Sequence, residues 1–152
     1  MKRNYEFENQ KIMLLNTLKE LIQEDPLRNH VDLSAKQISV VDNNSVDVLS
    51  RFKNMRSLDL SDNYLQKLPA NMELLKELQE LNLNGNPIED IELAVDSIKT
   101  VGQNLRCLHI NLFEEDQVDY LLRNLPWLQD LNGLTVEREA LFNEDSSDQE
   151  EE

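Results

Sequence analysis

Three residues in the second half of the chain have side chains that carry out chemistry in other proteins. In the stretch RCLHINLF, residues 106–113, they stand at alternate positions as Cys107, His109 and Asn111. A thiol protease uses these residue types as nucleophile, base and orienting group. A thiolate and an imidazole also bind transition metals. Whether the three side chains can act together depends on the backbone that carries them.

That backbone belongs to an internal repeat. The segments MRSLDLSDNYLQKLP (55–69) and LQELNLNGNPIEDI (78–91) align without gaps and fit the pattern L-x-x-L-x-L-x-x-N-x-L-x-x-L. Weaker copies lie in HVDLSAKQISVV, LRCLHINLFEE and LQDLNGL. Equivalent positions are residues 31, 58, 81, 108 and 131, at spacings of 27, 23, 27 and 23 residues. These spacings are those of leucine-rich repeats, which run to about 20–29 residues.

Each x-L-x-L-x segment is expected to form a short strand, because alternate side chains then point to opposite faces. The leucines face the interior of a solenoid and the x residues face solvent on a concave sheet. The asparagine of the pattern, Asn63 or Asn86, is expected to hydrogen-bond to turn backbone. Lys36 and Phe113 replace it in two copies, which predicts a local rearrangement. Phe113 is predicted to fill the core there, with an exposed contact beside Leu112 as the alternative.

Alternation on a strand argues against catalysis by the three reactive residues. Cys107, His109 and Asn111 all take concave positions, about 7 Å apart along the strand. A nucleophile and its base need about 2.6–3.2 Å between heavy atoms. A metal site would need ligands from neighbouring strands, and His30 lies three strands from His109. We therefore predict an exposed polar row, with no catalytic residue, no metal site and no cofactor.

The remaining segments are expected to close the ends and the convex side. Residues 6–24 carry Ile12, Leu15, Leu18 and Ile22 at helical spacing and predict an N-terminal capping helix. Shorter apolar stretches after each strand predict helices behind the sheet. We divide the chain into a capping segment 1–26, a repeat domain with a C-terminal cap 27–142, and an acidic tail 143–152. The tail has six acidic residues and no basic one, so we expect disorder.

Composition narrows the class of protein. The 152 residues suit one domain, and the net charge of −15 disfavours direct binding to nucleic acid or anionic membranes. The single cysteine favours a reducing compartment. MKRNYEFENQ and the residues after it contain neither a signal peptide nor a membrane span. We expect a soluble cytoplasmic protein, with the nucleus or a ciliary or cytoskeletal location as alternatives. Ser146 and Ser147 lie in acidic surroundings that suit acidophilic kinases.

The repeats, followed by LPWLQDLNGLTVERE (125–139), resemble small intracellular leucine-rich-repeat proteins that end in a C-terminal leucine-rich cap. That group includes the acidic leucine-rich nuclear phosphoproteins, the spliceosomal U2 A-prime protein, the leucine-rich dynein light chain and a leucine-rich regulator of protein phosphatase one. The resemblance implies an α/β leucine-rich-repeat solenoid with a concave parallel sheet of about five strands. It also implies a scaffold that binds another protein, while leaving the partner open.

The function expected from these features is non-enzymatic recognition of a protein. We predict an adaptor or regulatory subunit, monomeric by itself, that docks a basic or amphipathic segment on its concave face. The alternative is an acidic nuclear phosphoprotein-like binder of histones or other basic proteins that uses the acidic surface and tail. The alternative contact surfaces are an end of the solenoid and the convex helices. The predicted partner-binding residues are Asp32, Asp59, Asp62, Glu80, Asn82, Asn84, His109 and Asn111.

Overall fold

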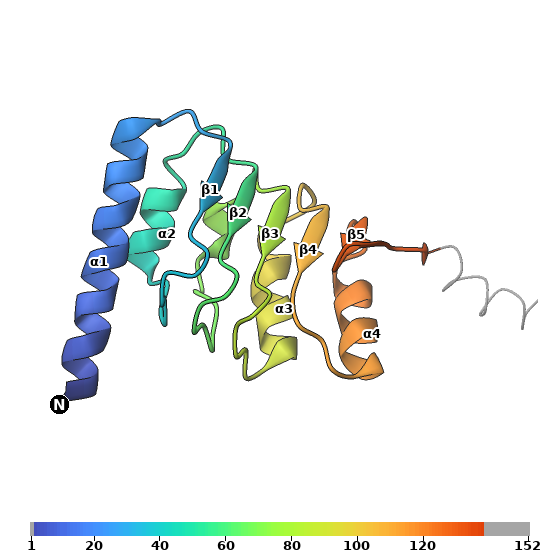
Figure 1. The fold of residues 1–152 in the computed structure, drawn as a ribbon. Helices are drawn as coiled ribbons and strands as arrows, with labels where there is room; N and C mark the ends of the chain where they lie inside the picture. The colour runs from blue at the N-terminus through green and yellow to red at the C-terminus, as the bar shows by residue number, and fades with distance from the viewer. Residues whose placement is uncertain (1, 139–152) are drawn as a thin grey trace, which may run out of the picture.

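The computed structural model describes residues 2–138 and shows a stack of short strands with helical segments behind them (Figure 1). The predicted domain end at residue 142, the acidic tail 143–152 and its two serines lie outside the described residues. In chain order the elements are α1 (Lys2–Glu24), β1 (His30–Asp32), α2 (Asn43–Leu49), β2 (Ser57–Asp59), the 3-10 helix η1 (Met72–Leu74), β3 (Glu80–Asn82), α3 (Ile91–Lys99), β4 (Cys107–His109), α4 (Glu115–Asn124), β5 (Asp130–Leu131) and β6 (Leu134–Thr135).

The sheet has the strand order β1-β2-β3-β4-β5-β6, and its first five strands are parallel. Its register follows the repeat, because residues 31, 58, 81, 108 and 131 are paired partners along the sheet. The predicted solenoid with a parallel sheet is therefore confirmed. Among the described residues no helix is both long and apolar enough to cross a membrane.

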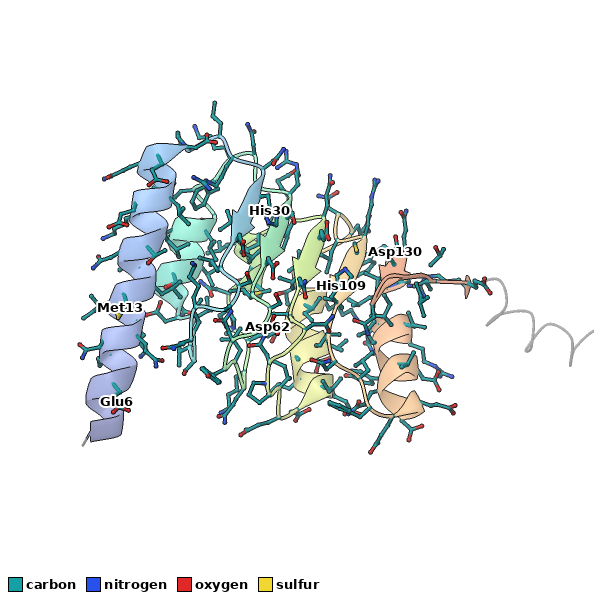
Figure 2. The ribbon with its side chains drawn as sticks, in the orientation of Figure 1. Glu6, Met13, His30, Asp62, His109 and Asp130 are labelled. Carbon is teal, nitrogen blue, oxygen red and sulfur yellow. The ribbon has the colours of Figure 1, made fainter. Side chains whose placement is uncertain are left out.

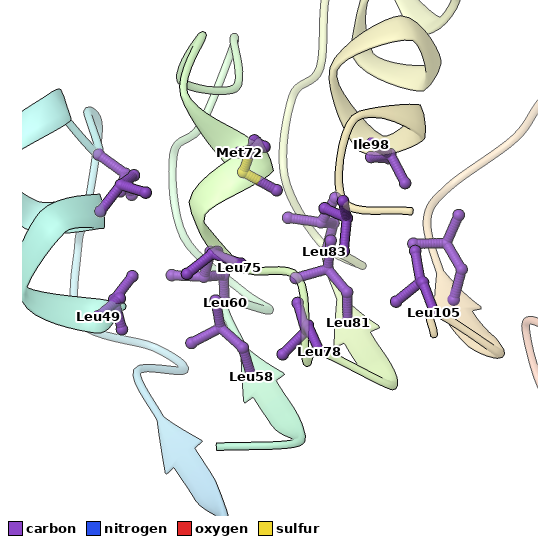
Figure 3. Close-up of a cluster of buried hydrophobic side chains, with 14 of the residues drawn as sticks. Leu49, Leu58, Leu60, Met72, Leu75, Leu78, Leu81, Leu83, Ile98 and Leu105 are labelled. Carbon is purple, nitrogen blue, oxygen red and sulfur yellow. The ribbon is translucent and has the colours of Figure 1, made fainter. Parts of the chain in front are cut away.

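The core is a ladder of leucines between the sheet and the helical segments. Figure 3 shows Leu58 and Leu60 of one repeat beside Leu81 and Leu83 of the next, and all four are buried. Leucines at these positions contribute about 1.5–3 kcal/mol each through removal from water. A single repeat has too little surface to bury its leucines alone, so neighbouring repeats stabilise one another.

The N-terminal end of the ladder is covered by α1, which packs against α2. Leu14 and Leu18 of α1 are buried, and Leu15 and Ile22 are partly buried against the core. The predicted helix is thus present, but its inward face is rotated from the predicted one. Ile12, expected in that face, is 55% exposed.

The C-terminal end turns back on itself after the fifth strand. Asn132 and Gly133 both have positive φ, 53° and 82°, and connect β5 to the antiparallel β6. Two such residues between strands are the signature of a type I′ hairpin. The sheet therefore has a sixth strand that the repeat pattern does not contain. Asn132, an x residue of the last repeat copy LQDLNGL, lies in this hairpin turn and not on a parallel strand.

The turns after the strands are joined by two buried asparagines. Asn63 accepts hydrogen bonds from the backbone N–H groups of Lys36 and Ile38, and its amide donates to the carbonyl of Leu33. Asn86 repeats the arrangement one repeat later, accepting from the N–H of Leu65. Each asparagine thus bonds to the repeat before it. Lys36 can replace asparagine in the first repeat because no repeat precedes it.

Phe113 corrects the prediction made for the fourth repeat. It was expected in the core, but it is 83% exposed, and Leu112 packs partly against the core instead. The Phe113 N–H donates to the side-chain oxygen of Gln117 in the first turn of α4. A polar side chain from the next repeat, Asn132, bonds to both backbone groups of Ile110.

Candidate functional site

The candidate site is the face of the sheet opposite the buried leucines, called the concave face below. Two rows of outward side chains cross it, and Figure 2 labels members of both. The first row, in strand order, is His30, Ser57, Glu80, Cys107 and Asp130, and the second is Asp32, Asp59, Asn82 and His109. Four of the eight predicted binding residues therefore form the second row, and Glu80 lies in the first.

The two aspartates of the second row also hold the turns that end their strands. Asp32 Oδ1 accepts from the backbone N–H of Ser34 at 2.9 Å and from its hydroxyl at 2.6 Å. Asp59 Oδ1 makes the same two bonds to Ser61, at 2.9 and 2.6 Å. The hydrogen bonds from Ser34 lower the pKa of Asp32 below its ordinary value. Each aspartate thus uses one carboxylate oxygen for the turn.

Asn82 takes the same place in the third repeat without a charge. Its Oδ1 accepts from the N–H of Asn84 at 3.1 Å. The amide oxygen of Asn84 is buried and has no hydrogen-bond partner. An asparagine here makes the backbone bond of the aspartates, which shows that the turn requires an acceptor and not a charge. The charges of Asp32 and Asp59 are therefore surplus to the fold.

Asp62 and Asn111 were predicted on the concave rows but lie in the turns at one edge. Asp62 has a φ of 56°, is exposed, and donates its backbone N–H to the carbonyl of Asn84. Asn111 Oδ1 accepts from the N–H of Gly85 at 2.6 Å. The Asn111 side chain bridges two repeats, and this structural role explains the asparagine without any contact to a partner protein. The structure thus separates these two edge residues from a central group on the strands, which consists of Asp32, Asp59, Glu80, Asn82 and His109.

The reactive residues are closer than strand spacing suggested. Cys107 Sγ lies 3.6 Å from His109 Nε2, within hydrogen-bonding distance for sulfur. Glu80 Oε1, on the neighbouring strand, lies 4.0 Å from the same nitrogen. The expectation that Cys107 and His109 cannot meet was wrong, because their side chains lean toward each other above the strand. On the neighbouring strand, Glu80 thus lies within reach of both residues.

This proximity does not produce a thiol nucleophile. Burial raises the pKa of the Cys107 thiol, and the negative charges of Glu80 and Asp130 raise it further. A reactive cysteine needs the opposite, a lowered pKa that yields the thiolate near neutral pH. The third residue of the set, Asn111, bonds to Gly85 and does not orient His109. The contact therefore lacks both the activated thiol and the oriented base of a thiol protease.

Comparisons with known proteins agree with the repeat. Residues 53–95 match a family described as leucine-rich repeats in two copies. The chain is 38% identical over 93 residues to human "Leucine-rich repeat protein 1", an alignment that covers 59% of this chain and 22% of that protein. It is 35% identical over 86 residues to "Chaoptin" of Drosophila melanogaster, covering 56% of this chain and 6% of that one. The chain spans a minor part of both relatives.

A solved structure shares the fold. A chain in the crystal structure of the Drosophila melanogaster SNF/U2A′ complex superposes with a TM-score of 0.58 at 13% sequence identity, covering 72% of this chain and 75% of that one. The repeat pattern, the register of the parallel sheet, and these matches show that the chain contains leucine-rich repeats and has the solenoid fold of such repeats.

Proposed function

We propose that the protein is a non-enzymatic interaction module, an adaptor or regulatory subunit that docks a basic or amphipathic protein segment on its concave face. Leucine-rich-repeat proteins generally mediate protein–protein interactions. The proposed contact residues are the central group on the strands, with Asp59, Glu80 and His109 at its middle. We further propose that it works as a monomer within a larger complex in the cytoplasm, with the nucleus and the ciliary or cytoskeletal location as the alternatives.

The observation that carries the proposal is the surplus charge of the second row. Asp32 and Asp59 use one carboxylate oxygen in a turn that Asn82 makes without charge. Glu80 adds a carboxylate that is half exposed. Exposed charge pairs are worth about 0.2–1 kcal/mol each. They therefore mainly select and orient a basic segment, while apolar and amide contacts would supply the rest of the affinity.

The test separates charge from turn geometry. Asp59→Asn keeps the oxygen that the Ser61 turn requires, as Asn82 does, and Glu80→Gln keeps the size of its side chain. With the partner recovered by affinity purification from native cells, titration calorimetry should show about tenfold weaker binding by the double variant, the effect of two exposed pairs. The matched control is Glu20→Gln, an exposed carboxylate on α1. Unchanged affinity in the double variant would assign the partner to an end or to the convex helices.

A second candidate function rests on the total charge. The sequence carries −15, and six acidic residues fall in positions 143–152. An acidic nuclear phosphoprotein-like binder of histones or other basic proteins would use this charge through loose contacts. Such a complex should dissociate at about 0.5 M salt, because that concentration screens exposed pairs. It should also weaken strongly when residues 143–152 are deleted, whereas docking on the concave face should survive both changes.

A further inference from the structure

We propose that Glu80, Cys107 and His109 form a binding site for a borderline-soft divalent cation, Zn²⁺ being the best fit, on the concave face. The three residues offer a carboxylate oxygen, a sulfur and an imidazole nitrogen, and these atoms all lie within 4.8 Å of one another. Among the side chains of the described residues, this is the one group of three or more such donors at that spacing. The site requires no protein partner and goes beyond the proposed function.

The distances match a tetrahedral ion with little movement. Zn–S of about 2.3 Å and Zn–N of about 2.0–2.1 Å at a tetrahedral angle put the two donor atoms about 3.6 Å apart. Cys107 Sγ and His109 Nε2 lie 3.6 Å apart. The corresponding nitrogen–oxygen separation is about 3.4 Å. Glu80 Oε1 is 4.0 Å from Nε2, and its half-exposed side chain can move the remaining distance.

The positions of the ligands are set by the repeat. Cys107 and His109 lie two residues apart on β4 and therefore point to the same face. Glu80 is the paired partner of Cys107 on β3. A parallel strand pair holds such partners about 4.8 Å apart. Two adjacent strands thus present the three donors from rigid backbone, which lowers the entropy lost when an ion orders them.

The charge around the cysteine favours a cation. Glu80 and Asp130 oppose ionisation of the Cys107 thiol, and burial opposes it more strongly. A bound dication reverses this balance, because the thiolate then neutralises part of the metal charge and the thiol proton is released. His109 is 23% exposed, so the ion would sit partly shielded from water. Sulfur and nitrogen donors favour Zn²⁺ over Mg²⁺ or Ca²⁺, which prefer oxygen.

Three protein ligands leave one tetrahedral position open to solvent or to a side chain of a docked protein. Structural zinc sites use four protein ligands, whereas open sites use three and a water. The other acidic residues of the concave face lack this donor set. Asp32 and Asp59 belong to no such donor group and each give one carboxylate oxygen to a serine turn, while His30 Nδ1 contacts Ser57 Oγ at 2.8 Å.

The experiment uses the full chain, freed of metal and kept reduced. Titration of Zn²⁺ against a chromophoric chelator should give one ion per chain, and Co²⁺ should give a thiolate-to-metal charge-transfer band with tetrahedral d–d bands. Cys107→Ser and His109→Gln should each weaken Zn²⁺ binding by more than tenfold, and Cys107→Ser should abolish the charge-transfer band. Glu80→Gln should weaken binding by a smaller factor, because a carboxylate at 4.0 Å is the least engaged donor.

Matched controls are His30→Gln, which removes the other histidine, and Asp59→Asn, which removes a carboxylate of the same face. Both should bind Zn²⁺ like the original chain, and circular dichroism should show each variant folded. Zn²⁺ binding that survives unchanged in both Cys107→Ser and His109→Gln would come from other carboxylates and would overturn the proposal. The absence of a charge-transfer band with Co²⁺ would overturn it as well. Neither result bears on the proposed docking function, because no protein partner is present.

Discussion

The substitution Asn63→Ala tests whether the asparagines hold the repeats together. Asn63 is 3% exposed, and its side chain bonds to the backbone of two repeats. Removing it leaves the N–H of Ile38 and the C=O of Leu33 without their partner inside the protein. The C=O of Leu60 keeps a second donor, the amide of Asn86, and the N–H of Lys36 lies nearer to solvent.

The expected cost follows from these groups. A buried backbone group left unpaired costs about 1–3 kcal/mol. Two such groups, with partial access of water through the new space, give a loss of about 3 kcal/mol in the free energy of unfolding. This is a large share of the total, since domains are stable by about 5–15 kcal/mol. Asn132→Ala should cost about 2 kcal/mol, about 1 from its two part-buried bonds to Ile110 and about 1 from placing alanine at a φ of 53°.

Urea denaturation followed by far-ultraviolet circular dichroism measures both losses, and Trp127 fluorescence provides a second probe near the C-terminal end. The control is Asn54→Ala, an exposed asparagine in the turn before β2, expected within about 0.5 kcal/mol of the original chain. An Asn63→Ala variant as stable as the Asn54→Ala variant would refute the reasoning. It would mean that water or a shifted turn satisfies the freed backbone at little cost.

Two further predictions concern neighbouring sites. Gly85 has a φ of 76°, and a Cβ there would lie 3.1 Å from the backbone N and Cα of Asp62, so Gly85→Ala should cost about 2 kcal/mol in urea denaturation. Gly102→Ala, with φ 103° and no atom within 4 Å of the added Cβ, should cost less. An equal loss of stability in the two variants would show that contact with Asp62 adds nothing to the cost at Gly85. Because the pKa of Cys107 is raised, less thiolate is present at pH 7.5, and iodoacetamide should alkylate the native chain several-fold more slowly than the unfolded chain by mass spectrometry. Glu80→Gln should recover part of that rate, and no difference between native and unfolded chains would contradict the raised pKa.

The repeat made the sheet predictable in detail. Once the leucine pattern fixed residues 31, 58, 81, 108 and 131 as equivalent, the register of the five parallel strands followed, and the structure has those pairs. Periodicity succeeds here because an inward leucine out of register would expose its side chain and bury a polar neighbour. The sixth strand has its own signal, the Asn132–Gly133 dipeptide typical of a type I′ hairpin, but the repeat pattern does not contain it.

The pattern failed where a residue replaced the asparagine. Phe113 stands at the repeat position that Asn63 and Asn86 occupy in the two preceding repeats. Both asparagines are buried, so a large apolar residue was expected to fill the same place in the core. What decides its place is backbone hydrogen bonding in the turn, which a phenyl ring cannot supply. Leu112 packs partly against the core, and the Phe113 ring is left exposed. Whether a side chain is buried at a repeat position thus depends on whether it can make the hydrogen bonds required there. Hydrophobicity alone does not predict its burial.

The group of Glu80, Cys107 and His109 shows what a one-strand view of a repeat omits. Spacing along a strand fixes the face to which a side chain points and the distance between Cα atoms, about 7 Å for alternate residues. It does not fix the distance between side-chain tips, which is 3.6 Å for Cys107 and His109. The register already implied the third member, since Glu80 precedes position 81 as Cys107 precedes position 108. In a solenoid, the residues able to meet are therefore found by reading across equivalent positions of adjacent repeats together with alternate positions along one strand.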